Sequence, residues 1–486
     1  MLLKNSYDVI VVGAGPVGLF LAAELHRFGV DVAVLERLAE PSQQIKAGSV
    51  GSPSAEIFDQ RGLLDRFAQP DLSMFPKNLP VGHFAGLWLL RGAPELRTLP
   101  IFAAQPEVEA VLEAHARDLG LPVLRGYEVT GLDGERVTAE HDGATVHLRA
   151  RFVVGCDGGR STVRRLAGFA FAGTPATITG RQALVELAEP NPLDKGWHHT
   201  DTGVIVFGPG PQRVLTVEFD GPPPAADRDR PLDRAEIEGS LRRVSGRAVV
   251  VDRLITGTRW TDNTRQAAPY RRGNILLAGD AAHVHPPFGG QGLNLGFQDA
   301  VNLGWKLAAT INGRAPEGLL DTYHDERAPV AAAALANTRA QVALMRPGPQ
   351  SAALRAVFTD LLAYDEPNAH LTRLMSGVDR PYAIDSDHPQ AGRIVADRPI
   401  GATRLWELLR EPGGLLLDAT PDRSATELAA RWAGRVRTVP GPENLLIRPD
   451  GIVAWGGEGT DGLEKALTTW FGSSAALVIA PFAAPG

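Results

Sequence analysis

Short runs of hydrophobic residues alternate with a segment of helical periodicity at the start of the chain. Residues 7–12 form an apolar run that ends in glycine, which is typical of a buried parallel strand. Residues 16–28 place leucine and alanine on neighbouring faces of a helix, and Gly29 ends it. Residues 30–35 form a second apolar run. The pattern therefore predicts a β-α-β unit.

The pattern changes twice further along the chain. Residues 178–260 show the alternation of an antiparallel sheet, with a polar loop rich in Pro, Asp and Arg at 221–232. Residues 275–278 then return to the parallel-strand pattern. Helices are predicted over 107–119, 293–311, 319–344, 351–375 and 463–471, and further strands over 152–155, 415–418, 445–447 and 453–455.

These changes predict an α/β fold, α+β overall, in which a sheet region interrupts the part that carries the β-α-β unit. The boundaries that we expect are 1–177 for the first part (with 75–100 contributing to the sheet region), 178–260 for the sheet region, 261–345 for the returning segment and long helices, 346–385 for a helical linker, and 386–486 for a C-terminal domain.

Composition and charge exclude several classes. The net charge of −7 argues against a nucleic-acid surface, which needs a dense basic patch. The single cysteine, Cys156, excludes an intramolecular disulfide and a cysteine-cluster metal site, and we expect no metal. No run of about 18 apolar residues occurs, so no membrane span is expected. A cytoplasmic protein is the expectation that results.

The first glycine motif lies between the first predicted strand and helix. Residues 13–18 read GAGPVG, in which Gly13 permits a tight turn, Gly15 lets a pyrophosphate approach the backbone and Gly18 lets helix and strand pack closely. The helix start then offers free N–H donors to phosphate. Glu36 ends the second strand and is placed to accept both hydroxyls of a ribose, which favours FAD or NAD over NADP.

Two further glycine-rich turns follow predicted strands. In GCDGGRS, Gly158 brings the backbone close to a ligand and Asp157 supplies an acceptor. In LLAGDAAH, Asp280 stands just past a buried strand, where α/β folds bind ligands, and is a candidate acceptor for a ribityl hydroxyl. The glycines of 289–292 expose N–H donors at the start of a long helix, a suitable place for the negatively charged edge of a reduced flavin.

The ordered trio GAGPVG with Glu36, GCDGGRS, and LLAGDAAH with PPFGGQGLN resembles the class A (single-component) flavoprotein monooxygenases of the para-hydroxybenzoate hydroxylase-like superfamily. Residues 56–64 and 299–307 resemble its subgroup of actinobacterial polyketide hydroxylases and rifampicin monooxygenases. The resemblance spans about 7–330. It implies a Rossmann-type FAD-binding domain, an inserted antiparallel-sheet substrate domain and a C-terminal thioredoxin-like domain. Because the tail has no cysteine, we expect that domain to serve packing or dimerisation.

The resemblance also implies an activity. Family members bind FAD, take electrons from NADPH or NADH as a transient co-substrate, and react with O₂ to form a flavin C4a-hydroperoxide. The implied reaction is hydroxylation of a bulky aromatic, polyketide-type small molecule. Rifampicin-type antibiotic inactivation and Baeyer–Villiger oxygenation are the alternatives within this class, and a flavin-binding protein without turnover is the alternative outside it. The catalytic base, the choice of reductant, and monomer against homodimer stay open.

Site residues follow from the resemblance position by position. Phe84 or Trp88 is expected to stack on a planar substrate, with core packing as the alternative for each. Pro286, Pro287 and Phe288 are expected to form a rigid apolar wall that keeps water from the flavin, and Phe288 is also a candidate substrate contact. The cofactor-binding residues that the resemblance implies are Gly13, Gly15, Pro16, Gly18, Glu36, Arg37, Lys46, Gln105, Asp157, Gly158, Asp280, Pro287, Gly290, Gly292, Leu293 and Asn294.

Two positions depart from the family pattern, because relatives commonly carry arginine where Lys46 and Pro53 stand. Lysine keeps the charge but loses the planar fork that grips phosphate in two places, and proline keeps neither charge nor donor. We therefore expect weaker retention of FAD than in relatives.

Other polar residues invite a chemical interpretation that we do not favour. His283 and His285 are interpreted as histidines that pack the third motif, and the pair at 198–199 as solvated loop residues. The acid pair Asp325 and Glu326, followed by Arg327, is interpreted as a local ion pair on a helix.

Overall fold

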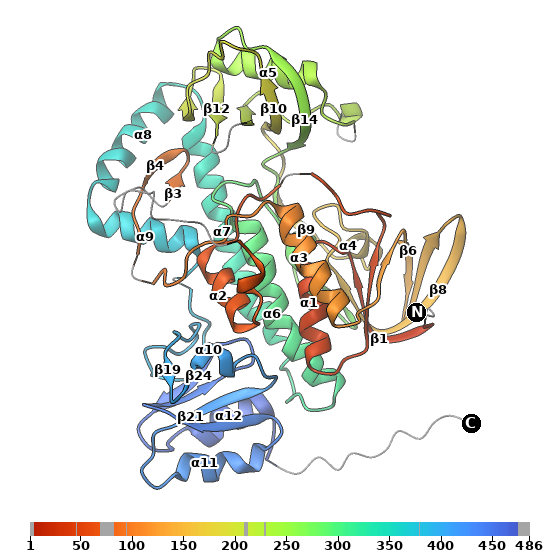
Figure 1. Ribbon diagram of the computed structural model, residues 1–486, viewed down its shortest axis with the longest axis vertical. Coiled ribbons are helices and arrows are strands. Elements are labelled where there is room, and N and C mark those ends of the chain that lie inside the picture. The colour runs from red at the N-terminus through yellow and green to blue at the C-terminus, as the bar shows by residue number, and fades with distance from the viewer. Residues whose placement is uncertain are drawn as a thin grey trace.

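The chain folds into a central α/β part, a second sheet above it and a C-terminal part below it (Figure 1). None of the helices in the described ranges is long and apolar enough to cross a membrane. The computed structural model describes residues 4–44, 46–68, 82–93, 95–208, 212–227, 230–378 and 380–474.

The central sheet carries the predicted β-α-β unit. Its strands run in the order β16-β17-β8-β1-β2-β5, and the pairs from β17 to β5 are parallel. Val9 and Ile10 of β1 point to opposite faces and are both fully buried, so the sheet is packed on both sides. The strands are β1 (Ser6–Val12), β2 (Val32–Glu36), β5 (Val123–Arg125), β8 (Ala144–Gly155), β16 (Arg271–Arg272) and β17 (Ile275–Leu277), with the hairpin β6 (Glu128–Asp133) and β7 (Arg136–His141) on β8.

Helices that follow these strands place the glycine turns at one edge of the sheet. Helix α1 starts with proline directly after the Gly15 N-cap, and α6 starts after Gly290, which has a left-handed φ of 64°. Helix α1 packs along α6 and α3. The helices of this part are α1 (Pro16–Arg27), α2 (Ser52–Gln60), α3 (Gln105–Asp118), α4 (Thr162–Leu166), α6 (Gln291–Ile311) and α7 (Thr322–Met345), with the 3₁₀ turns Leu64–Arg66 and Gly279–Ala281.

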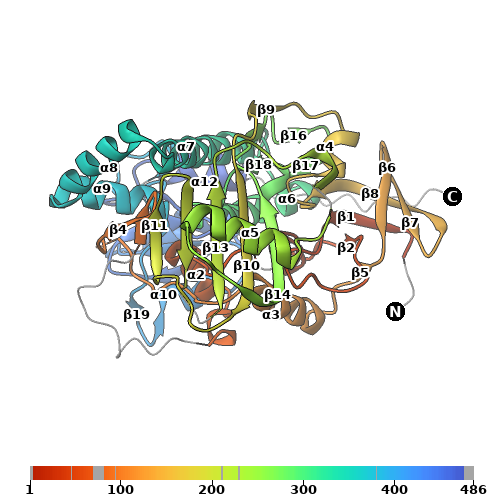
Figure 2. The same ribbon diagram turned by 90° about the horizontal axis from the view of Figure 1, so that it is seen from above.

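The second sheet spans residues 179–260 and has five antiparallel strands in the order β11-β12-β13-β10-β14. Helix α5 lies across its outer face, where Ile237 and Leu241 are fully buried (Figure 2). The inner face packs on residues of α7 and on Phe288. The elements are β10 (Thr179–Leu187), β11 (Gly196–His199), β12 (Gly203–Phe207), β13 (Arg213–Glu218), β14 (Val251–Trp260), α5 (Arg234–Ser245) and the 3₁₀ turn Ala225–Asp227.

The prediction of one helix over 351–375 is wrong. The structure has α8 (Pro349–Leu362) and α9 (Asp365–Ser376), separated at Ala363 and Tyr364. Asp365 and Glu366 lie in the first turn of α9 and complement its dipole there. Close to α9 lies the hairpin β3 (Gly82–Phe84) and β4 (Leu87–Leu90), and a small sheet joins β9 (Phe171–Thr174), β15 (Thr264–Ala267) and β18 (His283–Val284).

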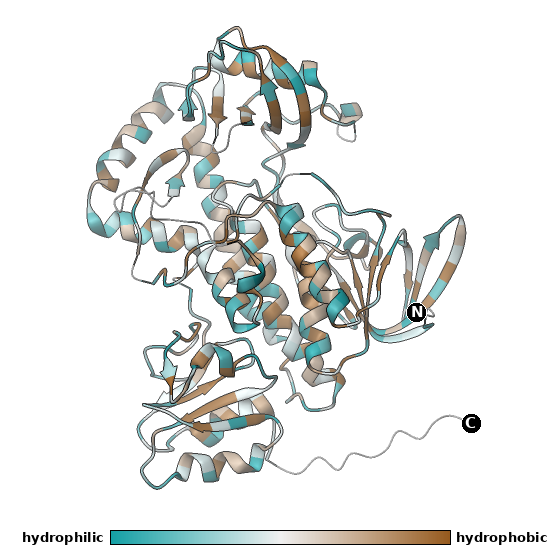
Figure 3. Cartoon of the chain, viewed as in Figure 1, coloured by the Kyte–Doolittle hydropathy of each residue, from teal (hydrophilic) through white to brown (hydrophobic). Residues whose placement is uncertain are grey.

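The C-terminal part is built on a four-stranded sheet in the order β22-β21-β23-β24, whose first pair is parallel and whose other pairs are antiparallel. Its central strands are among the hydrophobic segments of Figure 3. Its elements are β19 (Pro399–Ile400), β20 (Thr403–Arg404), α10 (Leu405–Leu408), β21 (Gly414–Asp418), α11 (Ser424–Ala429), β22 (Val436–Pro440), β23 (Asn444–Ile447), β24 (Val453–Gly457), α12 (Leu463–Phe471) and the 3₁₀ turn Ala430–Trp432.

A buried charge cluster joins this part to α6 and α7. Glu326 accepts hydrogen bonds from Arg448 (2.6 and 2.8 Å), Lys306 (2.7 Å) and Asn302 (2.6 Å). Arg448 also pairs with Asp450 and lies 4.4 Å from the ring centroid of Trp470. The arrangement overturns the expected local pair of Glu326 with Arg327, whose guanidinium instead binds Asp299 at 2.8 Å. We call Asn302, Lys306, Glu326, Arg448 and Asp450 the interdomain cluster.

Candidate functional site

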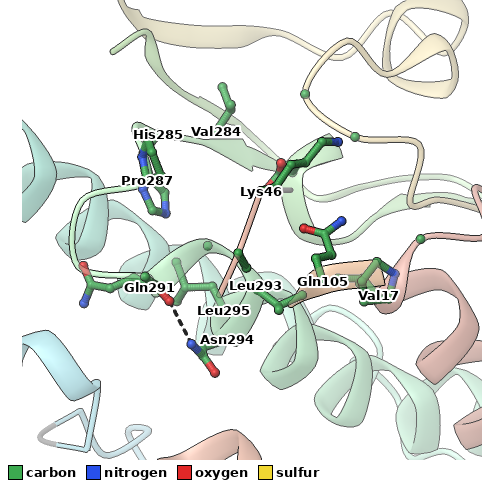
Figure 4. A pocket seen from close by; sticks show the side chains of 18 of the residues that line it. Val17, Lys46, Gln105, Val284, His285, Pro287, Gln291, Leu293, Asn294 and Leu295 are labelled. Atoms are coloured by element: carbon green, nitrogen blue, oxygen red, sulfur yellow. Dashed lines mark hydrogen bonds between the residues drawn. The ribbon is translucent and has the colours of Figure 1, made fainter. Parts of the chain in front are cut away.

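One cavity of about 1620 Å³ lies where the carboxyl ends of β1, β2 and β8, the start of α6 and the inner face of the five-stranded sheet meet. Figure 4 shows residues that line it from three segments of the chain, among them Lys46, Gln105, Leu293 and Asn294. Of the residues implied for the cofactor, the cavity is lined by Gly13, Gly15, Pro16, Glu36, Arg37, Lys46, Gln105, Asp157, Gly158, Asp280, Pro287, Gly290, Gly292, Leu293 and Asn294. Gly18 does not line it.

The first motif has the geometry that its glycines predict. Gly13 has a φ of 108°, and a Cβ there would lie 2.5 Å from the carbonyl oxygen of Cys156. A Cβ on Gly18 would lie 2.0 Å from the carbonyl oxygen of Gly13, so this glycine permits the contact of helix and turn. A Cβ on Gly15 would meet nothing within 4 Å, which leaves room for a ligand at the N-terminus of α1.

Glu36 connects the end of β2 to the glycine turn. Its Oε2 accepts the N–H of Ala14 at 2.8 Å, and its Oε1 accepts the N–H of Leu38 at 2.9 Å. Each carboxylate oxygen can accept a second hydrogen bond, so the pair still offers acceptors to the hydroxyls of a ribose.

Asp157 has one satisfied and one unsatisfied oxygen. Oδ2 accepts the N–H groups of Thr162 (2.6 Å) and Val163 (3.1 Å) at the first turn of α4. Oδ1 is buried and has no hydrogen-bond partner among the described residues. Because a buried acceptor without a donor is costly, this atom is suited to a ligand hydroxyl or N–H.

Asn294 holds the start of α6 against the segment 46–51. Its Nδ2 donates to the carbonyl of Gly290 at 2.8 Å, the bond drawn in Figure 4, and its Oδ1 accepts the N–H of Gly51 at 2.8 Å. Gly292 has His285 and Asp280 beside it, since a Cβ there would lie 3.5 Å from Nε2 of His285 and 3.8 Å from Oδ1 of Asp280. The exposed carboxylate of Asp280 therefore lies beside the first turn of α6, and a Cβ on Gly290, its N-cap, would meet nothing within 4 Å.

The two histidines of the third motif differ in role. His283 is fully buried and its Nε2 binds Asp299 at 2.6 Å, which is a packing role. His285 Nδ1 donates to the carbonyl of Pro286 at 2.8 Å, while its Nε2 is buried without a partner among the described residues. Burial lowers the pKa of His285, so the ring is neutral and Nε2 is an acceptor that lines the cavity.

Gln105 and Lys46 belong to one contact between α3 and the segment 46–51. The N–H of Gln105 donates to the carbonyl of Ala47 at 3.0 Å, and its Nε2 donates to Glu109 at 2.7 Å. Burial raises the pKa of the Glu109 carboxyl overall, although Gln105 and Lys46 act against that rise. Lys46 therefore brings a positive charge to this wall of the cavity.

The aromatic residues divide between cavity and core. Trp88 and Phe288 line the cavity, and Phe288 lies edge-on to Trp260 with 5.2 Å between ring centroids. Phe84 does not line it: the ring is 4% exposed and stacks on Phe358 at 5.8 Å. The structure thus places Phe84 in the core, which was the alternative to a substrate contact.

Sequence reasoning missed most residues on the substrate side. His83, Trp197, Gln182, Arg213 and Trp260 all line the cavity. They lie on β3 and on the inner face of the five-stranded sheet, at alternate positions of strands whose two faces are both partly apolar. The period of two was visible in the sequence, but it does not say which face meets the cavity.

The remaining candidates do not form a second site. His199 Nε2 bonds the carbonyl of Ala85 at 2.9 Å, and His198 bonds the carbonyls of Asp194 and Lys195, so the pair belongs to β11 rather than to a solvated loop. In the described part of the chain no group of three or more His, Cys, Asp or Glu is placed to hold a metal. Burial raises the pKa of the Cys156 thiol, which makes it inert.

The cavity fits FAD on its own geometry. It combines a glycine turn open at a helix N-terminus, a strand-end carboxylate, an unsatisfied acceptor on Asp157 and a second helix start flanked by Asp280. Its volume also exceeds the range of about 300–1,000 Å³ that is usual for one drug-sized ligand. That leaves space for a dinucleotide cofactor and a substrate together.

Comparison with known proteins agrees with this geometry. Residues 6–338 match the family described as "FAD binding domain", and residues 388–474 match "Aromatic-ring hydroxylase, C-terminal". The rifampicin monooxygenase of Streptomyces venezuelae is 42% identical over 97% of this chain and 100% of its own length. The dialkyldecalin synthase of Streptomyces rugosporus is 39% identical over 97% and 100%.

The fold matches as well. The structure of an anhydrotetracycline hydroxylase from Streptomyces rimosus superposes with a TM-score of 0.87 at 38% identity, over 97% of this chain and 100% of that chain. These matches confirm the resemblance seen in the glycine motifs. The chain therefore belongs to the FAD-dependent aromatic-ring hydroxylases and is an FAD-dependent monooxygenase.

Proposed function

We propose that this enzyme hydroxylates a bulky aromatic, polyketide-type small molecule, with NADPH or NADH as the electron donor. The observation that carries the proposal is that one cavity joins the cofactor groups at the strand ends to an aromatic-lined sheet face. When bound and reduced, FAD would activate O₂, which is the source of the oxygen atom transferred to the substrate. The protein's own task is to bind, to orient and to exclude water.

Side chains for each task line the cavity. Gly13, Gly15 and Glu36 would hold the adenosine and pyrophosphate half of FAD, and Asp280 and the start of α6 the flavin half. Pro287 and Phe288 would exclude water, since Phe288 is 2% exposed and packs against Trp260.

A planar substrate has a matching surface. The ring of His83 lies 4.3 Å from Trp197 and 5.2 Å from Trp88, centroid to centroid, and all three line the cavity. Aromatic side chains placed in this way bind flat ring systems by stacking and by edge contacts. This wall supports a polycyclic aromatic substrate over a small aliphatic one.

We also propose the assignment of domains and their roles that the sequence indicates. Residues 1–177 and 261–345 would form the FAD-binding domain, 178–260 the substrate domain, and 386–486 a thioredoxin-like domain. The four-stranded sheet with one parallel pair, packed beside α11 and α12, supports the last assignment. The interdomain cluster supports a structural role for that domain.

The test is turnover in ¹⁸O₂. Purified protein with FAD is given NADPH or NADH and a panel of phenolic polyketides and ansamycin antibiotics. The proposal expects one ligand to accelerate reductant consumption and to gain one ¹⁸O atom on an aromatic ring. Insertion beside a ring ketone would instead indicate Baeyer–Villiger oxygenation. An isomerised product without ¹⁸O, or loss of all electrons to H₂O₂ with every ligand, would count against hydroxylation.

A further inference from the structure

The turn of the β3–β4 hairpin is fixed from three directions beside the cavity. Ala85 and Gly86 both have a left-handed φ, of 53° and 83°, which is unfavourable for a residue with a side chain such as Ala85. The N–H of Ala85 donates to Oε1 of Gln341 on α7 at 3.1 Å, and its carbonyl accepts a hydrogen bond from Nε2 of His199 on β11 at 2.9 Å. The N–H of Gly86 donates to Nδ1 of His83 at 3.2 Å. These contacts hold His83 in one position.

The same contacts determine which nitrogen of His83 carries the hydrogen. Burial lowers the pKa of His83 to about 4, so the ring is neutral near pH 7 and has one N–H group. Because Nδ1 accepts the N–H of Gly86, that hydrogen is on Nε2. His83 is therefore a neutral hydrogen-bond donor, and nothing in the described part of the chain accepts from its Nε2.

This donor belongs to the aromatic wall of the cavity. The partly buried ring of His83 lines the cavity, and its centroid lies 4.3 Å from that of Trp197 and 5.2 Å from that of Trp88. The two nitrogens of an imidazole point in nearly opposite directions, so Nε2 points away from the hairpin turn that Nδ1 faces. A flat ligand packed on these rings would therefore bring an atom of its edge to Nε2.

A second donor on the substrate side also lacks a partner. Nε1 of Trp260, at the end of β14, is buried and has no acceptor among the described residues, and Trp260 lines the cavity. His83 packs against Trp197 on β11, which is at the opposite edge of the five-stranded sheet from β14. A donor without an acceptor is costly in a site that excludes water. The ligand that suits this side is therefore extended and brings acceptor atoms.

A carbonyl oxygen is the ligand group that suits Nε2 of His83. It accepts in the plane of a flat ring system and brings no hydrogen of its own. A hydroxyl oxygen also accepts, but its hydrogen would then need an acceptor that an aromatic wall does not supply. A carboxylate or phosphate would lose more hydration than one neutral donor returns. The wall therefore favours flat molecules that carry a ring carbonyl.

We propose that His83 determines substrate specificity: its Nε2–H donates a hydrogen bond to a ring carbonyl of the substrate and so fixes the direction in which the polycycle lies in the cavity. The inference rests on the proposed function, because it concerns the orientation of the same aromatic substrate. No proton or electron is transferred in this contact. His83 selects polycyclic ketones and quinones over the corresponding hydrocarbons and positions the ring that is hydroxylated.

The test is binding to the oxidised holoenzyme without a nicotinamide. The probe is 2-(hydroxymethyl)anthraquinone, which is uncharged and carries ring carbonyls, and the reference is 2-(hydroxymethyl)anthracene, the same frame without them. Affinities come from quenching of protein fluorescence. Infrared difference spectra of the bound quinone should show a carbonyl stretching band at lower wavenumber than in an aprotic solvent, because a donated hydrogen bond weakens the C=O bond.

Two variants separate the donor from the turn. The side-chain oxygen of asparagine takes the place of Nδ1, so His83→Asn keeps the acceptor for Gly86 and removes the donor. The longer amide of glutamine reaches the place of Nε2, so His83→Gln keeps a donor and loses that acceptor. His83→Asn should lower the ratio of quinone affinity to anthracene affinity about fivefold and return the carbonyl band to higher wavenumber. His83→Gln should change the ratio less than about twofold.

A control variant makes the same chemical change away from the cavity. His198 lies on β11 and bonds the carbonyls of Asp194 and Lys195, so His198→Asn should change neither the ratio nor the band. Near-UV circular dichroism and FAD content check the fold of each variant. If His83→Asn does not fold, the position of the carbonyl band in wild-type protein decides.

Several outcomes would overturn the inference. They are failure of wild-type protein to bind the quinone, a wild-type carbonyl band at the position seen in aprotic solvent, an unchanged ratio in His83→Asn, and a larger change of the ratio in His83→Gln than in His83→Asn, which would assign His83 to the turn alone. Hydroxylation of polycycles with and without a carbonyl at equal rates would reject the role of His83 but not the proposed function. A carbonyl contact without any oxygen insertion would do the reverse.

Discussion

Two polar regions lie along helix α6 and treat buried charge in opposite ways. Three turns from the start of the helix, the interdomain cluster pairs each carboxylate with cations: Glu326 binds Lys306 and Arg448, and Arg448 binds Asp450. At the start of the helix, the cavity leaves Oδ1 of Asp157 and Nε2 of His285 without partners in the described structure, and Arg213 without a carboxylate.

The difference separates groups that hold the fold from groups that bind a ligand. A buried charge that is fully paired contributes to a defined structure, although its desolvation offsets much of its attraction. A buried polar group without a partner costs free energy unless a ligand supplies one. Changes in the interdomain cluster should therefore alter stability, and changes in the cavity should alter ligand affinity.

The largest effect should come from Glu326→Gln. The substitution leaves Lys306 and Arg448 close together and poorly compensated in a buried site, which typically costs about 3–5 kcal/mol. Urea unfolding of the holoenzyme should show this loss. The backbone amide hydrogens of α7 and of the C-terminal part, where the two are in contact, should also exchange with solvent faster. Glu464→Gln, in an exposed pair with Arg431, should cost less than about 1 kcal/mol. Equal losses in the two variants would refute the distinction.

Asp157→Asn should lower FAD affinity while leaving the stability of the apoprotein almost unchanged. The side-chain oxygen of asparagine can still accept the N–H groups of Thr162 and Val163, so the stability of the apoprotein should change by less than about 0.5 kcal/mol. The amide, however, replaces the free acceptor with a donor, so FAD affinity should fall about tenfold or more. Flavin fluorescence gives that affinity. The control is Asp233→Asn at the N-cap of α5, which should change neither quantity; a stability loss without an affinity loss in Asp157→Asn would contradict the assignment.

Acid should affect the two regions in different pH ranges. The folded pKa of His83 is lowered from 6.5 to about 4, so the unfolded chain binds more protons and stability falls as pH drops through that range. The pKa of Glu326 is lowered from 4.5 to about 2 by Arg448 and Lys306, against the effect of burial, so its contribution is lost only below pH 4.5. His83→Gln should therefore lose about 1–2 kcal/mol less than wild type between pH 7 and pH 5.

Chemical denaturation at pH 7, 6 and 5 measures that slope. Glu326→Gln serves as the comparison, because its deficit should stay constant over this interval and shrink only in stronger acid. A wild-type slope that His83→Gln does not flatten would show that the ring is hydrated rather than buried.

Local patterns predicted the cofactor side of the site well. The predicted strand at 7–12 and helix at 16–28 differ from β1 and α1 by one residue at an end, because Pro16 and the glycine turn act on their immediate neighbours. The break in the predicted helix at 351–375 also had a local signal that was not used: Asp365 and Glu366 followed by Pro367, residues that favour a first turn.

Contacts between distant segments had no such signal. Glu326 and Arg327 are adjacent, yet Glu326 meets Arg448, which is 122 residues away, while Arg327 meets Asp299. On β13 both faces carry apolar residues, so only the register with β10 shows that Arg213 and Leu215 face the cavity. Substrate residues are therefore the part of the site that requires the folded structure.

The smallest effect is expected at Lys46, where the resemblance leads us to expect arginine. Lys46 lines the cavity beside Gln105, on the segment that Asn294 holds against α6 (Figure 4). Arginine would add a planar pair of donors for an anionic cofactor group, so Lys46→Arg should tighten FAD binding about two- to tenfold, with little change in apoprotein stability. Lys195→Arg, on an exposed loop away from the cavity, controls for the added arginine. Because the cavity is the region with unsatisfied polar groups, donors added there should act through the ligand. A rise in apoprotein stability at unchanged FAD affinity would place Lys46 with the groups that hold the fold.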